Sequence, residues 1–281
     1  MSDLTQEETI EYYLGKDKFK NLYFKGKSLP GAYDLINDRK NDYDLIIKNR
    51  EATFFAASGT PEERSFTSRI NNLGYRDSID YSIEDLQKFK KLFICVGCSD
   101  VLGPNLEDEY IWPNILQTKI DEFYGHNDFK VLNLGVLSGA PDTVSRILHG
   151  FVSCLSNISD ACIVWPYTQR REFVSVQKTF IITGMTQINE LPFPDYWNFI
   201  DWKSDSYNLH KNKIFCESFT KVNNINFHDL IINRYDKKVP FDFSSQLHAL
   251  GKKSNAAVAN YFFKKITNQP SLFEERKCSK A

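Results

Sequence analysis

The sequence has no long hydrophobic run, no strong net charge and few methionines or histidines. Its 281 residues include 2 methionines and 5 histidines. No stretch approaches the roughly 20 apolar residues that cross a bilayer. A net charge of −1 does not attract nucleic acid or anionic membranes through the overall field of the protein. The N-terminus is acidic and polar, unlike a secretory signal. We therefore expect a soluble, cytoplasmic protein with no membrane span and no nucleic-acid partner.

The spacings that hold metals or nucleotides are also missing. No two histidines form a His-x-x-x-His pair, and no Gly-x-Gly-x-x-Gly occurs. The run Gly251-Lys-Lys-Ser254 resembles the end of a phosphate-binding loop but lacks the first glycine of that loop. Cys95 and Cys98 form a Cys-x-x-Cys without a second pair at zinc spacing. We expect reduced cysteines and neither a metal nor a cofactor.

Short apolar strands alternate along the chain with glycine-containing turns and amphipathic helices. The predicted strands cover residues 92–96, 129–135 and 161–165, and the two helices between them begin near Pro113 and Asp142. Continuously apolar strands separated by helices are typical of a parallel sheet that is covered on both faces. The pattern therefore predicts a three-layer α/β/α domain with a flavodoxin-like parallel sheet.

The flanking regions are less regular. Residues 1–67 are predicted to form an N-terminal β-rich extension, and residues 68–281 the α/β domain. Lysines and aromatic residues interleave near the N-terminus, a pattern that favours an amphipathic hairpin over a platform for single-stranded nucleic acid. Further elements are expected at four places: a short helix from the capping box Ser82-Ile-Glu-Asp85 to about Lys90, strands at Lys213–Cys216 and Phe227–Ile232, and a helix over Ser254–Ile266.

A single serine, Ser99, stands at the crown of the turn after the first strand of the α/β region. Gly97 and Gly103 bound this turn. Ligands of open α/β sheets bind beyond the carboxyl ends of the strands. Glycines let the backbone crowd a hydroxyl outward and leave nearby N–H groups to meet an anion. The alternative is an ordinary glycine-bounded loop after a buried strand.

Among the five histidines, His248 is the candidate base for Ser99. It lies in a loop just before Gly251 and the final helix, which is a suitable place to supply a base from elsewhere in the fold. His149 lies on an amphipathic helix and is interpreted as a half-buried structural residue. His126 precedes the second strand and therefore belongs to the opposite edge of the sheet.

Five short motifs follow one another along the chain. They are Ile70-Asn-Asn-Leu-Gly-Tyr-Arg76 before the serine strand, Gly97-Cys-Ser99, Trp112-Pro113, Asn133-Leu-Gly135 to Gly139, and His248-x-x-Gly251. In this order they resemble the SGNH (GDSL-type) hydrolase family in its Gly-Cys-Ser variant. The resemblance covers roughly residues 68–265.

The resemblance implies a serine esterase that removes acyl or acetyl groups. Ser99 matches the nucleophile and His248 the general base, and the backbone N–H groups of Ser99 and Gly139 match two oxyanion-hole donors. The implied substrate is a small-molecule, lipid or carbohydrate ester. Tyr196 and Trp197, in a segment rich in aromatics and prolines, are candidates to bind it.

The orienting carboxylate departs from the family pattern. Ser245 stands where the family usually has an aspartate three residues before the histidine. This leaves Asp242 or a backbone carbonyl to hold the imidazole. Losing such a carboxylate costs a triad several powers of ten in rate. A catalytically weak or inactive binding or structural protein on the same fold is therefore the alternative to the esterase.

The third oxyanion donor also departs from the pattern. The family usually has an asparagine after the third strand, where this chain reads Pro166-Tyr-Thr-Gln-Arg170. Thr168 or Gln169 is the candidate donor, and Arg170 is a candidate to bind substrate. Asp100, directly after the serine, would oppose an anionic transition state if it pointed inward.

Overall fold

The computed structural model describes residues 29–32, 50–55, 65–104, 106–125, 127–174, 179–182, 201–232 and 250–268. Within these residues a β-hairpin is followed by alternating strands and helices. The elements, in chain order, are β1 (Glu51–Phe55), β2 (Ser65–Arg69), α5 (Ile83–Leu86), β3 (Lys91–Gly97), α6 (Ser99–Leu102), the 3-10 turn η2 (Asp108–Tyr110), α7 (Trp112–Tyr124), β4 (Phe129–Gly135), α8 (Pro141–Cys154), β5 (Ile158–Trp165), β6 (Arg171–Val174), β7 (Thr179–Ile182), α10 (Trp202–Val222), β8 (Asn226–Ile231) and α11 (Lys252–Ile266).

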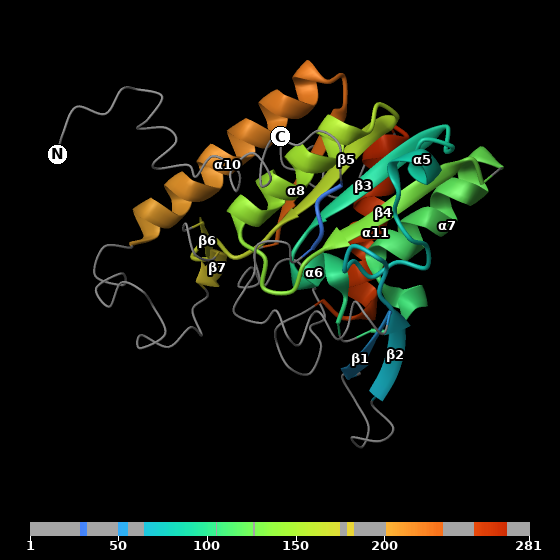
Figure 1. The fold of residues 1–281 in the computed structure, drawn as a ribbon, viewed down its shortest axis with the longest axis horizontal. Coiled ribbons are helices and arrows are strands. Elements are labelled where there is room, and N and C mark those ends of the chain that lie inside the picture. The colour runs from blue at the N-terminus through green and yellow to red at the C-terminus, as the bar shows by residue number, and fades with distance from the viewer. Residues whose placement is uncertain are drawn as a thin grey trace, which may run out of the picture.

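A four-stranded parallel sheet in the order β4-β3-β5-β8 forms the centre of the fold (Figure 1). In this sheet β3 pairs with β4 at Gly97↔Gly135 and with β5 at Cys95↔Cys162. Because β3 comes first in the chain yet lies inside the sheet, the chain passes to one side of it for β4 and to the other side for β5 and β8. This is the strand order of flavodoxin-like sheets. The predicted parallel α/β sheet and its three predicted strands are confirmed.

Helices cover both faces of the sheet and make three layers. Figure 1 shows α8 and α10 side by side on one face and α7 with α11 on the other. Ile94 of β3 packs in the core with Phe151 of α8, whereas its neighbour Phe93 packs with Phe262 of α11. Successive side chains of a strand point to opposite faces. The buried part of β3 is continuously apolar because both of its faces lie under helices.

Local signals set the ends of the main helices. Pro113 and Pro141 lie in the first turns of α7 and α8, where a missing N–H costs nothing. α7 ends at Gly125, whose φ of 69° is readily adopted by glycine. The predicted helices of this region are confirmed.

The helix predicted from the capping box at Ser82 is shorter than expected. The Ser82 side chain accepts a hydrogen bond from the backbone N–H of Asp85, as the motif predicts. However, α5 ends at Leu86 instead of continuing to about Lys90. Asn157, far along the chain, donates to the carbonyls of Leu86 at 2.9 Å and of Phe89 at 2.8 Å. The Asn157 side chain therefore supplies hydrogen bonds that the backbone of a further helical turn would otherwise provide.

The strand predicted at Lys213–Cys216 is wrong, because these residues lie inside the 21-residue helix α10. The buried face of α10 consists of Asn208, Asn212, Cys216 and Thr220, at a spacing of four. Three of these four residues are polar. The 3.6-residue apolar period that identifies an amphipathic helix is therefore absent from the sequence.

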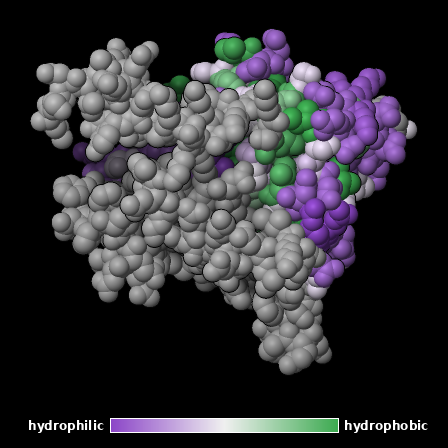
Figure 2. Space-filling view, viewed as in Figure 1, coloured by the Kyte–Doolittle hydropathy of each residue, from purple (hydrophilic) through white to green (hydrophobic). Residues whose placement is uncertain are grey.

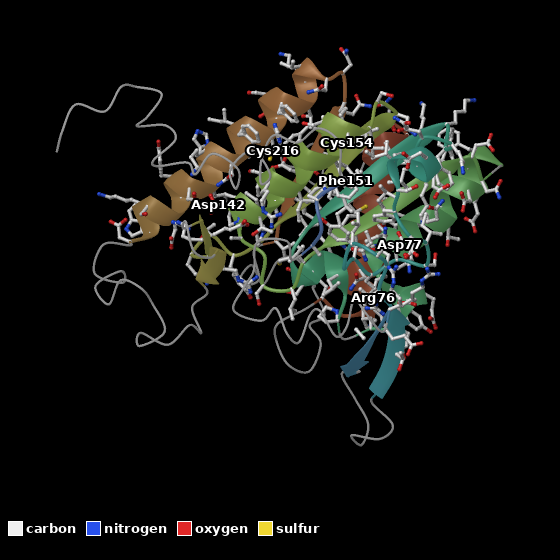
Figure 3. The ribbon with its side chains drawn as sticks, viewed as in Figure 1. Arg76, Asp77, Asp142, Phe151, Cys154 and Cys216 are labelled. Atoms are coloured by element: carbon white, nitrogen blue, oxygen red, sulfur yellow. The ribbon has the colours of Figure 1, made fainter. Side chains whose placement is uncertain are left out.

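Hydrogen bonds to α8 make this polar face of α10 stable when buried. Asn212 Nδ2 donates to Asp142 Oδ1 at 3.0 Å, and Asn208 Nδ2 donates to Asp142 Oδ2 at 3.2 Å. The hydroxyl of Ser145 donates to Asn212 Oδ1 at 2.7 Å. Figure 3 shows Asp142 and Cys216 where α8 and α10 meet. Buried amides are tolerated when they are paired in this way.

The hairpin of β1 and β2 includes most of the described residues of the predicted N-terminal β-rich extension. The two strands pair antiparallel, with Glu51 opposite Arg69. β2 runs across the predicted boundary between residues 67 and 68, and this division into domains stays a prediction. Nearer the N-terminus, Leu29–Ala32 lies against α8, where a Cβ added at Gly150 would be 2.6 Å from Pro30 Cγ.

The edge of the sheet where its strands begin is covered by polar side chains. Figure 2 shows hydrophilic residues gathered over the region where Figure 1 places α5 and α7. Glu84 and Asp85 of α5 are exposed there. The Ser99 turn lies at the other edge, where the parallel strands end.

Candidate active site

Ser99 is the first residue of α6, directly beyond the carboxyl end of β3. Cys98 precedes it as the N-cap, with φ −102° and ψ −145°. Ser99 is 7% exposed, and its hydroxyl donates to Cys98 Sγ at 3.8 Å. A thiol sulfur is a weak acceptor. The hydroxyl is thus held by a contact that a stronger acceptor can easily replace.

Two glycines let α6 lie directly on the strand ends. A Cβ at Gly97 would overlap Val101 and come within 2.5 Å of the Val164 carbonyl oxygen. A Cβ at Gly135 would overlap the backbone nitrogen of Leu102 and lie 2.7 Å from its Cα. Only glycine allows this approach, and the position of Ser99 depends on it.

The turn after β4 brings Gly139 next to the end of β3. The N–H of Val136 donates to the Gly97 carbonyl at 3.0 Å, and a Cβ at Gly139 would be 3.6 Å from the same oxygen. The N–H of Gly139 itself donates to the Val136 carbonyl at 3.1 Å. The structure thus places this glycine beside the serine turn with its N–H already bonded within its own turn.

The turn after β5 contacts the Gly139 turn through Arg170. Its Nη1 donates to the Gly139 carbonyl at 3.3 Å, and its guanidinium lies 5.0 Å from the ring centre of Tyr167. Thr168 and Gln169 are half-buried in this turn. The turns that carry Ser99, Gly139 and Thr168–Arg170 therefore meet at one edge of the sheet.

Arg171 holds this last turn in place. Its guanidinium donates to the carbonyl of Thr168 and, at 3.0 Å, to that of Arg170. Its Nη2 donates to Asp205 of α10 at 2.8 Å. The Thr168–Arg170 turn is thereby fixed to a helix of the α8 layer.

Two charges of opposite sign act on the Cys98 thiol. Asp100 is 5% exposed, and the thiol donates to its Oδ2 at 3.9 Å. Burial raises the pKa of Cys98, the charge of Asp100 raises it further, and the charge of Arg170 opposes both effects. A thiol with a raised pKa is a poor nucleophile at neutral pH. The Cys98 thiol, which is 1% exposed, is therefore not a candidate nucleophile.

Arg76 is a buried positioning residue that sequence reasoning missed. Its Nη1 donates to the carbonyls of Leu102, at 3.3 Å, and Gly103, and its Nη2 donates to that of Leu106 at 2.7 Å. It also pairs with Asp108 at 2.7 Å and is 1% exposed. Figure 3 shows Arg76 beside the segment that follows α6. The end of the serine-bearing helix is thus held by a guanidinium.

The sequence carries one signal for this role. Arg76 closes the stretch that begins at Ile70, which resembles a family motif. Burial lowers the pKa of Arg76, while the charge of Asp108 and its hydrogen bond raise it. Nothing in residue spacing indicates that a lone arginine after Tyr75 is buried.

His248, Asp242, Tyr196 and Trp197 lie outside the described residues. The described chain resumes two residues after His248, at Leu250, which packs in the same core cluster as Val101 of α6. The residues that lead into α11 therefore share a core with α6.

A chain of hydrogen bonds ties that neighbouring segment to the serine turn. Asn255 Nδ2 donates to the carbonyls of Leu250 and Gly251, both at 3.0 Å. Its Oδ1 accepts from the backbone N–H of Trp112 at 2.9 Å. The Trp112 indole N–H in turn donates to the Asp100 carbonyl at 3.0 Å. The Trp-Pro motif of the sequence therefore lies between the serine turn and the start of α11.

Within the described ranges, no three histidine, cysteine, aspartate or glutamate side chains are grouped to hold a metal ion. Over the same residues, no helix has the length and apolar character needed to cross a membrane. Cys95 and Cys98 are buried thiols that form no disulfide.

Comparison with known proteins finds similarity in structure alone. No protein-family model and no curated protein matches the chain. Among solved structures, the SGNH-hydrolase family esterase AlinE4 is 9% identical over 65% of this chain and 75% of that chain, with a TM-score of 0.33. The psychrotrophic esterase EstA from Pseudoalteromonas sp. is 13% identical over 65% of this chain and 76% of that chain, with a TM-score of 0.32. Values this low leave the function to be argued from the site.

Proposed function

We propose that this protein is a serine esterase in which Ser99 is the nucleophile. The observation that carries the proposal is the meeting of three turns at the carboxyl edge of the sheet. Ser99 follows β3, Gly139 follows β4, and Arg170 follows β5 and bonds to the Gly139 carbonyl. Ligands of such sheets bind at this edge, beside the strand where the chain order reverses. The substrate is a small-molecule, lipid or carbohydrate ester.

In the proposed mechanism, Ser99 Oγ attacks the ester carbonyl carbon while His248 accepts the hydroxyl proton. The carbonyl oxygen becomes an oxyanion that the N–H groups of Ser99 and Gly139 stabilise, with Thr168 or Gln169 as a third donor. His248 then protonates the leaving alcohol. Water releases the acyl group from Ser99 by the same steps.

Asp242 or a backbone carbonyl orients the imidazole in this proposal. A partner at the second ring nitrogen keeps a catalytic histidine in the tautomer that accepts the serine proton. Leu250 and Gly251, held by Asn255, keep the chain near His248 attached to the α7 layer. Tyr196 and Trp197 are proposed to contact the substrate.

One hydrogen bond must change before the proposed oxyanion hole is complete. The Gly139 N–H donates to the Val136 carbonyl at 3.1 Å, so it must turn toward the substrate or share its proton. Ser138, the residue before it, has φ 62°, which is uncommon for a residue other than glycine. We propose that substrate binding reorients the Ser138–Gly139 turn.

The same hydrogen bond favours a second candidate function, a non-catalytic binding or structural protein on this fold. Ser99 is 7% exposed, Asp100 adds a buried carboxylate beside it, and Ser245 replaces the usual aspartate. An idle site needs neither an accessible hydroxyl nor a free oxyanion donor.

Labelling with a fluorophosphonate probe tests the esterase. An activated serine displaces fluoride from the probe and forms a stable Oγ–P bond. Ser99→Ala is expected to abolish labelling, and His248→Ala to slow it by at least about 100-fold, because a general base contributes that much.

Ser159→Ala is the matched control. Its hydroxyl donates to the Leu92 carbonyl at 3.3 Å, near the opposite edge of the sheet, and its loss should leave labelling unchanged. Folded wild-type protein that takes up no probe would favour the non-catalytic candidate.

A further inference from the structure

Arg170 differs from the other arginines in the described part of the chain. Of the six arginines there, it is the one without a carboxylate within ion-pair distance in that part. The five pairs are Arg50 and Arg69 with Asp80, Arg76 with Asp108, Arg146 with Glu172, and Arg171 with Asp205.

Among the described residues, most of the N–H donors of this guanidinium have no acceptor. It has five N–H donors, and over the described residues it makes one hydrogen bond, to the Gly139 carbonyl at 3.3 Å. This distance is slightly longer than the usual range for N–H···O hydrogen bonds. A half-buried guanidinium with spare donors can bind an additional acceptor at low cost.

The guanidinium is also held in place beside the serine turn. The Tyr167 ring lies 5.0 Å from it, and Arg171 anchors the turn that carries it to Asp205. Its charge is close enough to affect the Cys98 thiol, the residue before Ser99. A fixed guanidinium loses less side-chain entropy when it binds a ligand.

We infer that the ester hydrolysed at this site carries an anionic group, a carboxylate or a phosphate, and that this group binds to the guanidinium of Arg170. The inference rests on the proposed esterase and adds the substrate class. Both anions present paired oxygens that match the planar fork of arginine.

Asp100 makes this assignment more demanding. Its carboxylate is buried next to the Cys98 thiol, one residue from Ser99, and a negative charge there repels an anion that approaches Ser99 directly. An anionic group is therefore expected at the Arg170 end of the substrate, away from the ester carbonyl. A neutral ester of the same size gains nothing from Arg170.

Turnover of a neutral and an anionic 4-nitrophenyl ester tests the inference. We compare 4-nitrophenyl acetate with the anionic 4-nitrophenyl hemisuccinate on wild type, Arg170→Gln and Arg170→Lys. Arg170→Gln is expected to lower kcat/KM for the hemisuccinate by about 10- to 100-fold, the worth of a charge-assisted hydrogen bond, and for the acetate by less than about threefold. Arg170→Lys should fall between wild type and Arg170→Gln. Equal losses for both esters, or none, overturn the inference.

Anion binding is measured separately, so that failure of the esterase does not hide the result. Calorimetric titration of Ser99→Ala protein with succinate and with inorganic phosphate requires no catalysis and shows which anion the site prefers. Binding that is lost in the double variant with Arg170→Gln supports the inference. Failure to bind either anion overturns it, even if wild type hydrolyses neutral esters.

Arg69→Gln is the control for a general loss of positive charge. Arg69 is an exposed arginine of β2 that pairs with Asp80 at 3.2 Å. Both its turnover ratio and its anion binding should match those of wild type.

Discussion

Arg76 connects three parts of the molecule that are separate in sequence. It accepts no hydrogen bond, and its donors reach Ser68 of β2, Asp108 of η2 and the carbonyls after α6. The planar guanidinium suits this place because one group satisfies several carbonyls at fixed angles. Ser99 lies at the other end of α6, so the hydrogen bonds of Arg76 also help to set the position of the candidate nucleophile.

Replacing Arg76 should therefore destabilise the protein. Arg76→Met leaves the buried carbonyls of Leu102 and Leu106 without their donor, and we expect a loss of about 2–4 kcal/mol in the free energy of unfolding. Asp108 is 54% exposed, so it can return to water, which limits the cost. Denaturation in urea measures the change.

The control for this prediction is Arg69→Met. Its side chain is 48% exposed, and its ion pair with Asp80 should contribute less than about 1 kcal/mol. Equal losses of unfolding free energy in Arg69→Met and Arg76→Met would contradict the proposed role of the Arg76 hydrogen bonds.

The hydroxyl of Ser99 makes only a weak hydrogen bond within the described residues. Its hydroxyl donates to a thiol at 3.8 Å, and no described carboxylate or imidazole is within hydrogen-bond distance of it. If the hydroxyl proton moves to a base, only the weak hydrogen bond to the Cys98 thiol is lost. The labelling experiment on Ser99 and His248 tests this directly.

At the scale of elements, the close packing of α6 on the ends of β3 and β4 sets the site. This packing depends on Gly97 and Gly135, since a Cβ at either position meets α6 or a neighbouring strand. A four-residue helix has little stability of its own. Its position is therefore set by what lies under it and by Arg76 at its end.

Gly135→Ala should displace α6 from the sheet. The added methyl would overlap the Leu102 backbone, and overpacking of this kind costs about 1–3 kcal/mol. We expect a lower free energy of unfolding together with slower fluorophosphonate labelling at Ser99. Thermal unfolding and labelling rates measure the two effects.

Gly125→Ala separates crowding from backbone conformation. Gly125 has φ 69° but nothing within 4 Å of an added Cβ, so alanine there costs about 1 kcal/mol for conformation alone. Its labelling rate should equal that of wild type. Slower labelling in Gly125→Ala would show that α6 responds to general destabilisation.

At the scale of the whole molecule, the contact between α8 and α10 contributes to the pH dependence of stability. The ring of His149 on α8 lies 4.8 Å from that of Phe219 on α10, which confirms that this histidine packs within the fold. Burial lowers the pKa of His149 below 6.5. The unfolded chain therefore takes up the proton first as the pH falls.

Stability should consequently decrease on acidification. The contribution of His149 is fully present above its unfolded pKa of about 6.5 and is lost as the pH falls through its lower folded pKa. We expect the free energy of unfolding to decrease less between pH 7.5 and 5 in His149→Phe than in wild type. Urea denaturation at several pH values measures this, and equal pH dependence in both proteins would contradict the assignment.

The sequence alone determined the parallel sheet, the helices α7, α8 and α11, and the position of Ser99 after β3. These features depend on local signals, such as continuous apolar runs, helix periodicity, and proline or glycine at helix ends. The sequence also predicts that Gly97 and Gly139 lie at the same edge of the sheet, because both follow strands that run in parallel. For His248 and Asp242 the sequence makes a prediction that stays open.

Tertiary structure decided the features that depend on distant partners. The strand that the sequence predicts at Lys213–Cys216 is part of α10, whose buried face is polar and is stabilised by Asp142 of α8. The sequence likewise does not show the burial of Arg76 or the link from Asn255 through Trp112 to Asp100. Nor does it show that Arg170 has no carboxylate at ion-pair distance among the described residues. Each depends on contacts between residues that are far apart in the chain, such as Arg76 with Leu102, Trp112 with Asn255, and Arg170 with Gly139. Local patterns predict which elements form, whereas the pairing of polar groups between them is decided only when the layers pack.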